Sequence, residues 1–165
     1  MKKIVILCIC AFAHLYGISS GFVAGALVKT LDGFIAIEQL NEHDIISVLG
    51  EDGVYTRKAV VIKSTCYVDH IVKLCIEDDE ILLAGLKQEF LKFGDTKWTF
   101  AEDLVVGDQL LTSRGYVTIR GIKICACETD LHWLSVLEVA NFYVSKYEIV
   151  VRDTNIFRHN VRDIS

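Results

Sequence analysis

The sequence predicts an all-β protein with little helix. Two observations carry this prediction. Short runs rich in β-branched and aromatic residues alternate apolar with polar side chains, as in TRKAVVIKS and GYVTIRGIKI, which is the period of a half-buried strand. The chain has no proline, so Gly, Asp, Asn and Ser must make the turns between these runs. Regular spacing of short strands is typical of a sandwich, a barrel or a curved sheet.

The predicted strands follow one another at short intervals after residue 20. Little helix is expected. IAIEQLNEH and FAEDLVVGD could each form one turn, and Leu83–Phe93 is the best candidate for a longer piece that is irregular or helical. The segments with strand composition are Phe22–Lys29, Asp44–Leu49, Arg57–Ser64, Ile71–Ile76, Lys97–Phe100, Gln109–Thr112, Tyr116–Ile124, Leu134–Val139 and Asn141–Val151.

An internal repeat supports the same fold class. The pattern x-E-x-L-x-x-x-D-x-[IL] starts at Ile37 and returns at Ala101, 64 residues later, and each copy runs on to a polar turn, at Gly50–Gly53 and Ser113–Gly115. Each copy reads as a chain reversal that packs its Leu inward and closes its turn through its Asp before a strand begins. The repeat predicts two duplicated β subdomains.

The first twenty residues read as a secretion signal. Lys2 and Lys3 precede an apolar run from Ile4 to Tyr16, and small residues end the segment before Gly21. The apolar run falls short of the roughly 20 residues of a membrane span, so a cleaved signal over residues 1–20 is favoured over an uncleaved anchor. A secreted or periplasmic protein that does not stay in the membrane is expected.

The charge of the chain argues against a nucleic-acid partner. Lys plus Arg number 17 against 22 Asp plus Glu, for a net charge of −5. Removing Lys2 and Lys3 with the signal lowers the 17 to 15, for a mature net charge of −7. No basic stripe remains that would neutralise a phosphate backbone.

Four cysteines remain after the predicted signal. In an exported chain an even number permits two disulfides, with three connectivities, but four buried thiols in a β core fit the apolar flanks equally well. A zinc site is not favoured, because Cys125-Ala126-Cys127 and His132 lack a second ligand pair at the usual spacing. For the acidic run 77–80, a solvated hairpin tip is a better interpretation than a calcium site. The four are Cys66, Cys75, Cys125 and Cys127.

Several segments in order resemble the Hedgehog/intein (Hint) family of self-processing domains. GFVAGALVKTLDGFIAIEQL, from Gly21, is similar to the first block of that family, and Trp98–Leu110, with AEDL and GD, is the most specific match. Asn141–Val144 and His159-Asn160 resemble its C-terminal strand and terminal pair. The resemblance implies an all-β Hint fold with pseudo-twofold β subdomains over residues 21–160, followed by a tail at 161–165.

The resemblance also implies a chemistry that this chain lacks at its first step. In the family, a leading cysteine attacks the preceding carbonyl carbon, and a Thr-x-x-His pair assists. Here Gly21 stands at the nucleophile position, and Gly85 and Gln88 stand at the Thr and His positions. Glycine has no attacking atom, and an amide is no general acid. Ser20 is a weak substitute, because it lies one residue out of register.

The C-terminal pair is better preserved. The resemblance implies that Asn160 would cyclise on its own carbonyl carbon with help from His159, releasing only residues 161–165. Val161 is not a Cys, Ser or Thr acceptor, so ligation is not expected. A strand end and turn at His159-Asn160 is the plainer interpretation.

Two function classes therefore stay open. One is a degenerate self-processing domain whose substrate is its own polypeptide, with no cofactor and no metal. The other is a secreted non-catalytic β scaffold or module that binds an unknown protein partner. A chance likeness in an unrelated β protein predicts no twofold relation between the segments around Glu38 and Glu102.

Overall fold

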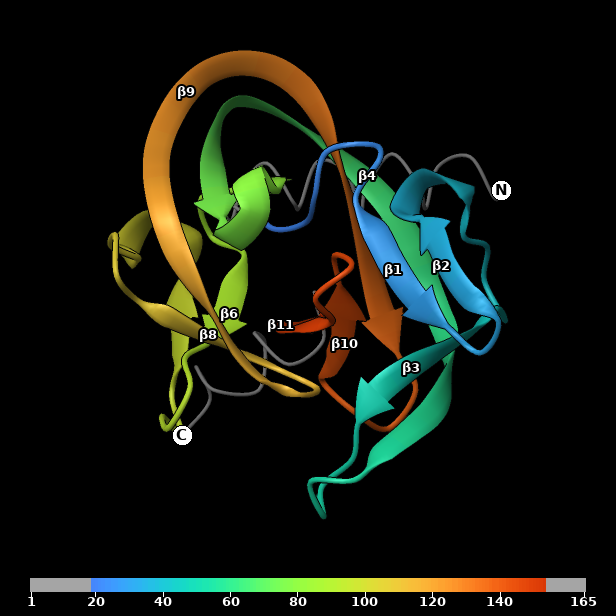
Figure 1. Cartoon of the computed structure of the whole chain (residues 1–165). Helices are drawn as coiled ribbons and strands as arrows, with labels where there is room; N and C mark the ends of the chain where they lie inside the picture. The colour runs from blue at the N-terminus through green and yellow to red at the C-terminus, as the bar shows by residue number, and fades with distance from the viewer. Residues whose placement is uncertain (1–18, 154–165) are drawn as a thin grey trace, which may run out of the picture.

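The computed structural model describes residues 19–153, and this part of the chain is almost entirely β (Figure 1). The strands join into one antiparallel sheet that curls around a central core, and the only helical pieces in it are three single 3-10 turns, η1 to η3. No described helix has the length and apolar character that crossing a membrane requires. The elements are β1 (Leu27–Thr30), β2 (Gly33–Ala36), η1 (Ile37–Gln39), β3 (Ile45–Leu49), β4 (Tyr55–Ile76), η2 (Glu77–Asp79), β5 (Ile81–Ala84), β6 (Glu89–Leu91), β7 (Trp98–Phe100), η3 (Ala101–Asp103), β8 (Gln109–Thr112), β9 (Gly115–Val136), β10 (Asn141–Val144) and β11 (Ile149–Arg152).

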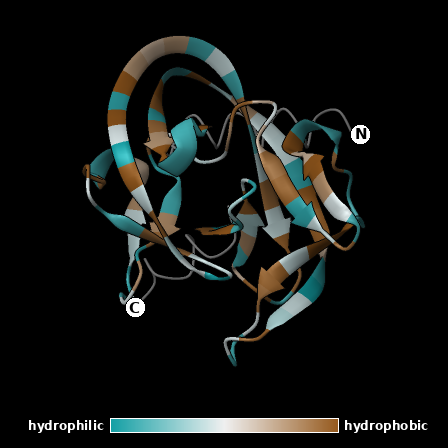
Figure 2. Cartoon of the chain, in the orientation of Figure 1, coloured by the Kyte–Doolittle hydropathy of each residue, from teal (hydrophilic) through white to brown (hydrophobic). Residues whose placement is uncertain are grey.

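Two long strands form the frame of the molecule. β4 and β9 each run for 22 residues and pair antiparallel from Val60↔Val136 to Ile76↔Ile119. Figure 1 shows both bending through a wide arch, and three irregularities in their register accompany that bend. Along β9, apolar and polar residues alternate for much of the strand (Figure 2).

The sequence-based division of these two strands was wrong. Arg57–Ser64 and Ile71–Ile76 are parts of β4, and Tyr116–Ile124 and Leu134–Val136 are parts of β9. The residues between them mix polar with apolar side chains and were predicted to be connections. No Gly or Pro breaks the chain there, and many of these side chains face solvent on the arch, so the pairing continues.

The predicted repeat is confirmed by equivalent contacts in the two halves. η1 and η3 each precede a buried leucine, Leu40 or Leu104. In the first half the Asp44 carboxylate accepts the amide N–H of Asn41 at 2.8 Å, and the Asp44 carbonyl accepts that of Val60 at 2.9 Å.

The second half repeats both contacts. The Asp108 carboxylate accepts the amide N–H of Val105 at 3.0 Å, and its carbonyl accepts that of Ile119 at 2.9 Å. This correspondence is the twofold relation that a chance likeness does not predict.

The segment Leu83–Phe93 contains no helix, contrary to one of the two forms expected for it. It consists of the end of β5, a tight turn over residues 85–88, and β6. β5 pairs with β4, and β6 pairs with β7 and β11, so sheet hydrogen bonds take the backbone groups that a helix would have used. Asn141–Val151 is likewise a hairpin, β10–β11, rather than one strand.

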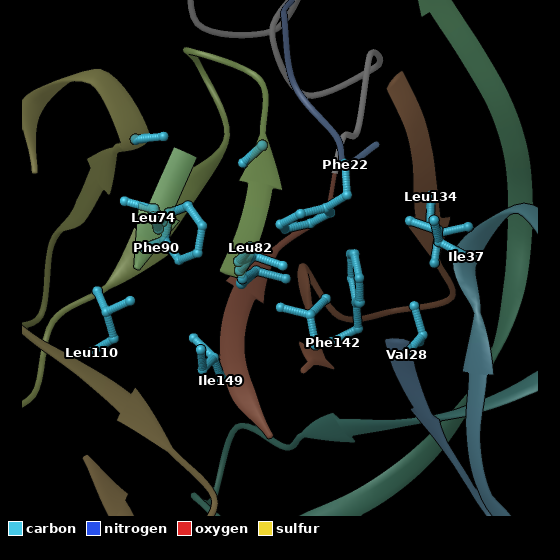
Figure 3. Packing of buried hydrophobic residues seen from close by; sticks show 14 of the residues in the cluster. Phe22, Val28, Ile37, Leu74, Leu82, Phe90, Leu110, Leu134, Phe142 and Ile149 are labelled. Carbon is cyan, nitrogen blue, oxygen red and sulfur yellow. The ribbon is translucent and has the colours of Figure 1, made fainter. Parts of the chain in front are cut away.

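The core lies inside the curl of the sheet, and Phe22 packs in it beside Phe90 and Phe142 (Figure 3). Phe22 is fully buried, and its ring meets Phe90 and Phe142 edge to face, with centroids 6.2 and 6.4 Å apart. Aromatic pairs in this geometry contribute about 0.5–1.5 kcal/mol beyond the area they bury. The aromatic contacts thus tie the start of the described chain to β6 and β10.

The acidic run 77–80 is a hairpin tip, as predicted. It forms η2 between β4 and β5, and the Tyr147 hydroxyl donates to the Asp78 carboxylate at 2.7 Å. Among residues 19–153 no group of three or more His, Cys, Asp or Glu side chains is arranged to hold a metal ion.

No two of the four cysteines face each other across the β4–β9 ribbon. Cys66 lies opposite Leu131, Cys75 opposite Gly121, and Cys125 opposite Ile71. No disulfide joins any two of them.

We predict that the two Asp turns contribute equally to stability. Asp44→Ala and Asp108→Ala each remove one carboxylate–amide hydrogen bond and should each lower the free energy of unfolding by about 1 kcal/mol. Urea denaturation measures this, with Asp44→Asn and Asp108→Asn as controls because asparagine keeps an acceptor oxygen. A loss at only one of the two positions would contradict the functional equivalence of the repeats.

A second prediction concerns Tyr143, which is 2% exposed and stacks on Tyr55. Burial, with Tyr55 and Glu148 nearby, raises the pKa of Tyr143 to about 12. An unfolded tyrosine loses its proton near pH ~10. The unfolded state therefore releases a proton first, and stability falls as the pH rises from about 10 to 12. Urea denaturation between pH 9 and 11 should show a shallower loss for Tyr143→Phe than for the unaltered chain. Parallel losses would rule the assignment out.

Candidate functional site

The segment around Gly21 is inserted as a short extra strand between β5 and β9. The amide N–H of Phe22 donates to the carbonyl of His132 at 2.9 Å, and the amide of His132 returns the bond at 2.7 Å. On the other side, the amide of Val23 donates to the carbonyl of Leu83 at 3.1 Å. The candidate site is therefore built by main-chain pairing, with Phe22 as its apolar anchor.

The turn after β5 continues this pairing upstream of Phe22. The amide of Gly85 donates to the carbonyl of Gly21 at 2.9 Å, and the amide of Lys87 donates to the carbonyl of Ser19 at 3.0 Å. A Cβ at position 85 would lie 2.0 Å from the Ser19 carbonyl oxygen and 2.6 Å from Leu131 Cδ1. Glycine at 85 is what permits this close approach.

Gly21 is subject to two restrictions. Its φ of +112° belongs to a region that residues with side chains rarely adopt. A Cβ on this backbone would lie 2.5 Å from the carbonyl oxygen of His132. Gly21 is buried, and the backbone in this structure leaves no room for a cysteine side chain at that position.

Glu38 holds the chain just beyond this strand. Its carboxylate accepts the amide N–H of Gly25 at 2.7 Å, and this hydrogen bond is the largest cause of the lowered pKa of Glu38. The amide of Ile37 donates to the carbonyl of Ala26 at 2.8 Å. The repeated Glu-containing turn thus fixes where the strand enters the site.

The Gln88 carboxamide lies at the centre of the site. Its Oε1 accepts the amide N–H of Gly21 at 2.9 Å and the hydroxyl of Ser20 at 3.1 Å. Its Nε2 donates to the carbonyl of Arg152 at 2.9 Å and to that of Glu89 at 3.1 Å. Gln88 is 1% exposed, so these bonds are shielded from water.

The carbonyl side of the Ser20–Gly21 peptide faces a thiol. Cys66 Sγ lies 3.8 Å from the Ser20 carbonyl oxygen, the distance of a weak S–H donor contact. The carbonyl and the amide of this peptide are thus both engaged. The side chains making these contacts are a thiol and a carboxamide, and a carboxamide does not titrate.

Three of the five predicted site positions come together here. Gly21, Gly85 and Gln88 are mutual neighbours through the bonds above. His159 and Asn160 lie outside the described residues. The described chain ends near the site at Asp153, whose carboxylate accepts the amide N–H of Val136 at 2.9 Å.

The sequence did not point to Arg152, His132 or Cys66 as parts of the site. Arg152 and His132 contribute main-chain groups, which leave no mark on residue type. Cys66 is one of four cysteines after the predicted signal, and nothing along the chain indicates that it lies beside Ser20. Pairing of β4 with β9 brings it there.

Comparison with protein families agrees with this architecture. The model of the pretoxin HINT domain matches residues 27–160, most of the chain. The chain belongs to the pretoxin HINT domain family. The match extends over His159 and Asn160 as well as both repeated turns. No curated protein matches this Hint domain.

Solved structures share the fold. A bacterial intein-like domain from Clostridium thermocellum superimposes with a TM-score of 0.76 at 24% identity, covering 82% of this chain and 99% of its own. A DnaB intein from Synechocystis sp. PCC 6803 superimposes with a TM-score of 0.72 at 14% sequence identity, and the match covers 83% of this chain and 100% of the intein. The TvoVMA intein superimposes with a TM-score of 0.72 at 15% sequence identity, and the match covers 82% of this chain and 99% of the intein. At these identities the likeness establishes the Hint fold alone.

The geometry predicts that Gly85→Ala is destabilising. The added methyl group must displace the Ser19 carbonyl or Leu131, and such overpacking costs about 1–3 kcal/mol. Urea denaturation measures the loss. Gly121→Ala is the matched control, because its Cβ would meet Cys75 Cβ at 3.3 Å, and it should change stability by less than about 1 kcal/mol. Equal effects of both substitutions would refute the close packing at Gly85.

Proposed function

We propose that this Hint domain descends from a self-processing module and has lost the N-terminal cleavage step. The observation that carries the proposal is Gly21. It stands at the nucleophile position, and its backbone runs so close to His132 that a side chain does not fit. Nucleophilic cleavage needs an attacking sulfur or oxygen at that point.

The assisting groups support the same interpretation. A general acid near neutral pH must exchange a proton, as imidazole does. Gln88 contacts the amide nitrogen of the Ser20–Gly21 bond through a carboxamide, and Gly85 contributes only its main chain. Substitution of both the nucleophile and its helper favours loss of the step over an unusual working site.

The C-terminal step is the part of the chemistry that the proposal retains. His159 and Asn160 stand where Hint domains carry their terminal pair, and the substrate would be the chain itself. Cyclisation of Asn160 would release residues 161–165 without ligation, since Val161 offers no nucleophile. The predicted signal places this reaction outside the cytoplasm, in a secreted or periplasmic protein.

A non-catalytic scaffold is the second candidate. It is favoured by the nature of the site contacts: the bonds around Ser20–Gly21 pair carbonyls with donors and amides with acceptors, which is how a protein holds a strand. In that case the domain would use its β surface to bind a protein partner.

Intact-mass measurement tests the proposal. The full chain should be made by cell-free synthesis without membranes, so that no signal peptidase acts, and incubated with and without dithiothreitol. We expect no cleavage at Ser20–Gly21 in either sample, because no thioester forms.

The same spectra test the C-terminal step. A mass lower by residues 161–165, absent in the Asn160→Ala control, supports residual cyclisation. Two unchanged masses leave the scaffold as the function. Thiol-dependent cleavage before Gly21 would disprove the loss of the N-terminal step.

A further inference from the structure

Gln88 connects two parts of the chain that lie far apart in sequence. Its Oε1 binds Ser20 and Gly21, and its Nε2 binds the carbonyl of Arg152 at the end of β11. We propose that, as long as the predicted signal at residues 1–20 is attached, Gln88 is a retaining clamp that binds this upstream polypeptide and ties it to the C-terminal strand. This inference rests on the proposed loss of N-terminal cleavage. It assigns Gln88 a positioning role, in addition to the loss of the general acid at this position.

The carboxamide suits this role because of its hydrogen-bonding inventory. An amide oxygen has two acceptor positions and an amide nitrogen has two donors, and Gln88 uses all four. A neutral imidazole offers one donor and one acceptor, a carboxylate only acceptors, and an ammonium only donors. Of these groups, the carboxamide alone accepts two bonds on one side and donates two on the other.

The two glycines complete the clamp. Gly85 lets the Ser19 carbonyl reach the amide of Lys87 at 3.0 Å, and Gly21 lets the strand lie against the His132 carbonyl. Each removes a side chain that would hold the strand away from its partners. Gly21, Gly85 and Gln88 thus each allow closer contact or additional hydrogen bonds between the upstream strand and the domain.

The clamp defines what it binds. Its ligand is an extended peptide with a hydroxyl side chain at position 20, read by Gln88 Oε1, and no side chain at position 21. Binding is coupled to the C-terminal end of the domain, because the same buried carboxamide serves the Arg152 carbonyl. While the upstream segment is attached, both ends of the domain are held at one point.

Amide hydrogen exchange in the full chain tests the clamp, using Gln88→Met. Methionine matches the length of glutamine but removes all four hydrogen bonds. Exchange should accelerate by at least about tenfold at the amides of Gly21, Lys87 and Asp153. The amides of His43 and Val60 should keep their rates because their acceptors, the Val60 and Asp44 carbonyls, belong to the first-half Asp turn and not to the strand bound by Gln88.

Other outcomes overturn the proposal. Equal acceleration at all five amides means that Gln88 serves general stability alone. Unchanged rates at Gly21, or acceleration at Gly21 with none at Asp153, show that Gln88 does not couple the two ends.

Ser20→Ala gives an independent test if Gln88→Met does not fold. It removes one hydrogen bond to Gln88 Oε1 and should speed amide exchange at Gly21 by about threefold. An unchanged rate would overturn the proposal that Gln88 recognises the Ser20 hydroxyl. Intact mass and amide exchange of the unaltered chain separate the two proposals. An unaltered chain cut before Gly21 refutes the loss of cleavage, whereas an intact unaltered chain whose Gly21 amide exchanges freely refutes only the clamp.

Discussion

Phe22 and the main-chain bonds on either side of it are the constraint on which the rest of this structure depends. The ring is fully buried between Phe90 and Phe142, and the backbone at Phe22 pairs with His132. Burying a phenylalanine side chain contributes about 1.5–3 kcal/mol, more than a typical surface contact. Because this anchor fixes the strand, the groups at Gly21 and Ser20 are held at defined positions, and every contact in the candidate site follows from that placement.

The duplicated architecture explains where the partners of that strand come from. In each half a 3-10 turn, a buried leucine and an Asp-closed turn lead into a short strand and then a 22-residue strand. The two long strands pair along the arch, which puts Cys66 of β4 and His132 of β9 beside the N-terminal segment. The turn after β5 supplies Gly85 and Gln88 from the opposite side. A site made this way uses backbone groups as much as side chains, so it can keep its shape when its reactive residues change.

Much of the fold was predictable from local pattern. Period-2 alternation and the absence of proline indicated strands, because these signals depend on neighbouring residues only. The 64-residue repeat indicated two halves, because each copy is a short pattern of residue types that can be matched along the chain. The interruptions predicted at Thr65–His70 and Cys125–Trp133 were wrong, because many of these side chains are exposed on the arch while the backbone pairing of β4 with β9 continues through them. The helical form considered for Leu83–Phe93 was wrong because β4, β7 and β11 compete for its backbone hydrogen bonds.

The sequence by itself determined the fold class, the repeat and the unusual residues at positions 21, 85 and 88, because residue type and spacing are written along the chain. Only the tertiary structure decided what those residues do to one another. The positive φ of Gly21, the 2.0 Å approach that a Cβ on Gly85 would face, and three of the four bonds of Gln88 arise where segments more than 60 residues apart meet. Such contacts involve main-chain carbonyls and amides, which every residue carries, so no pattern of letters could reveal them.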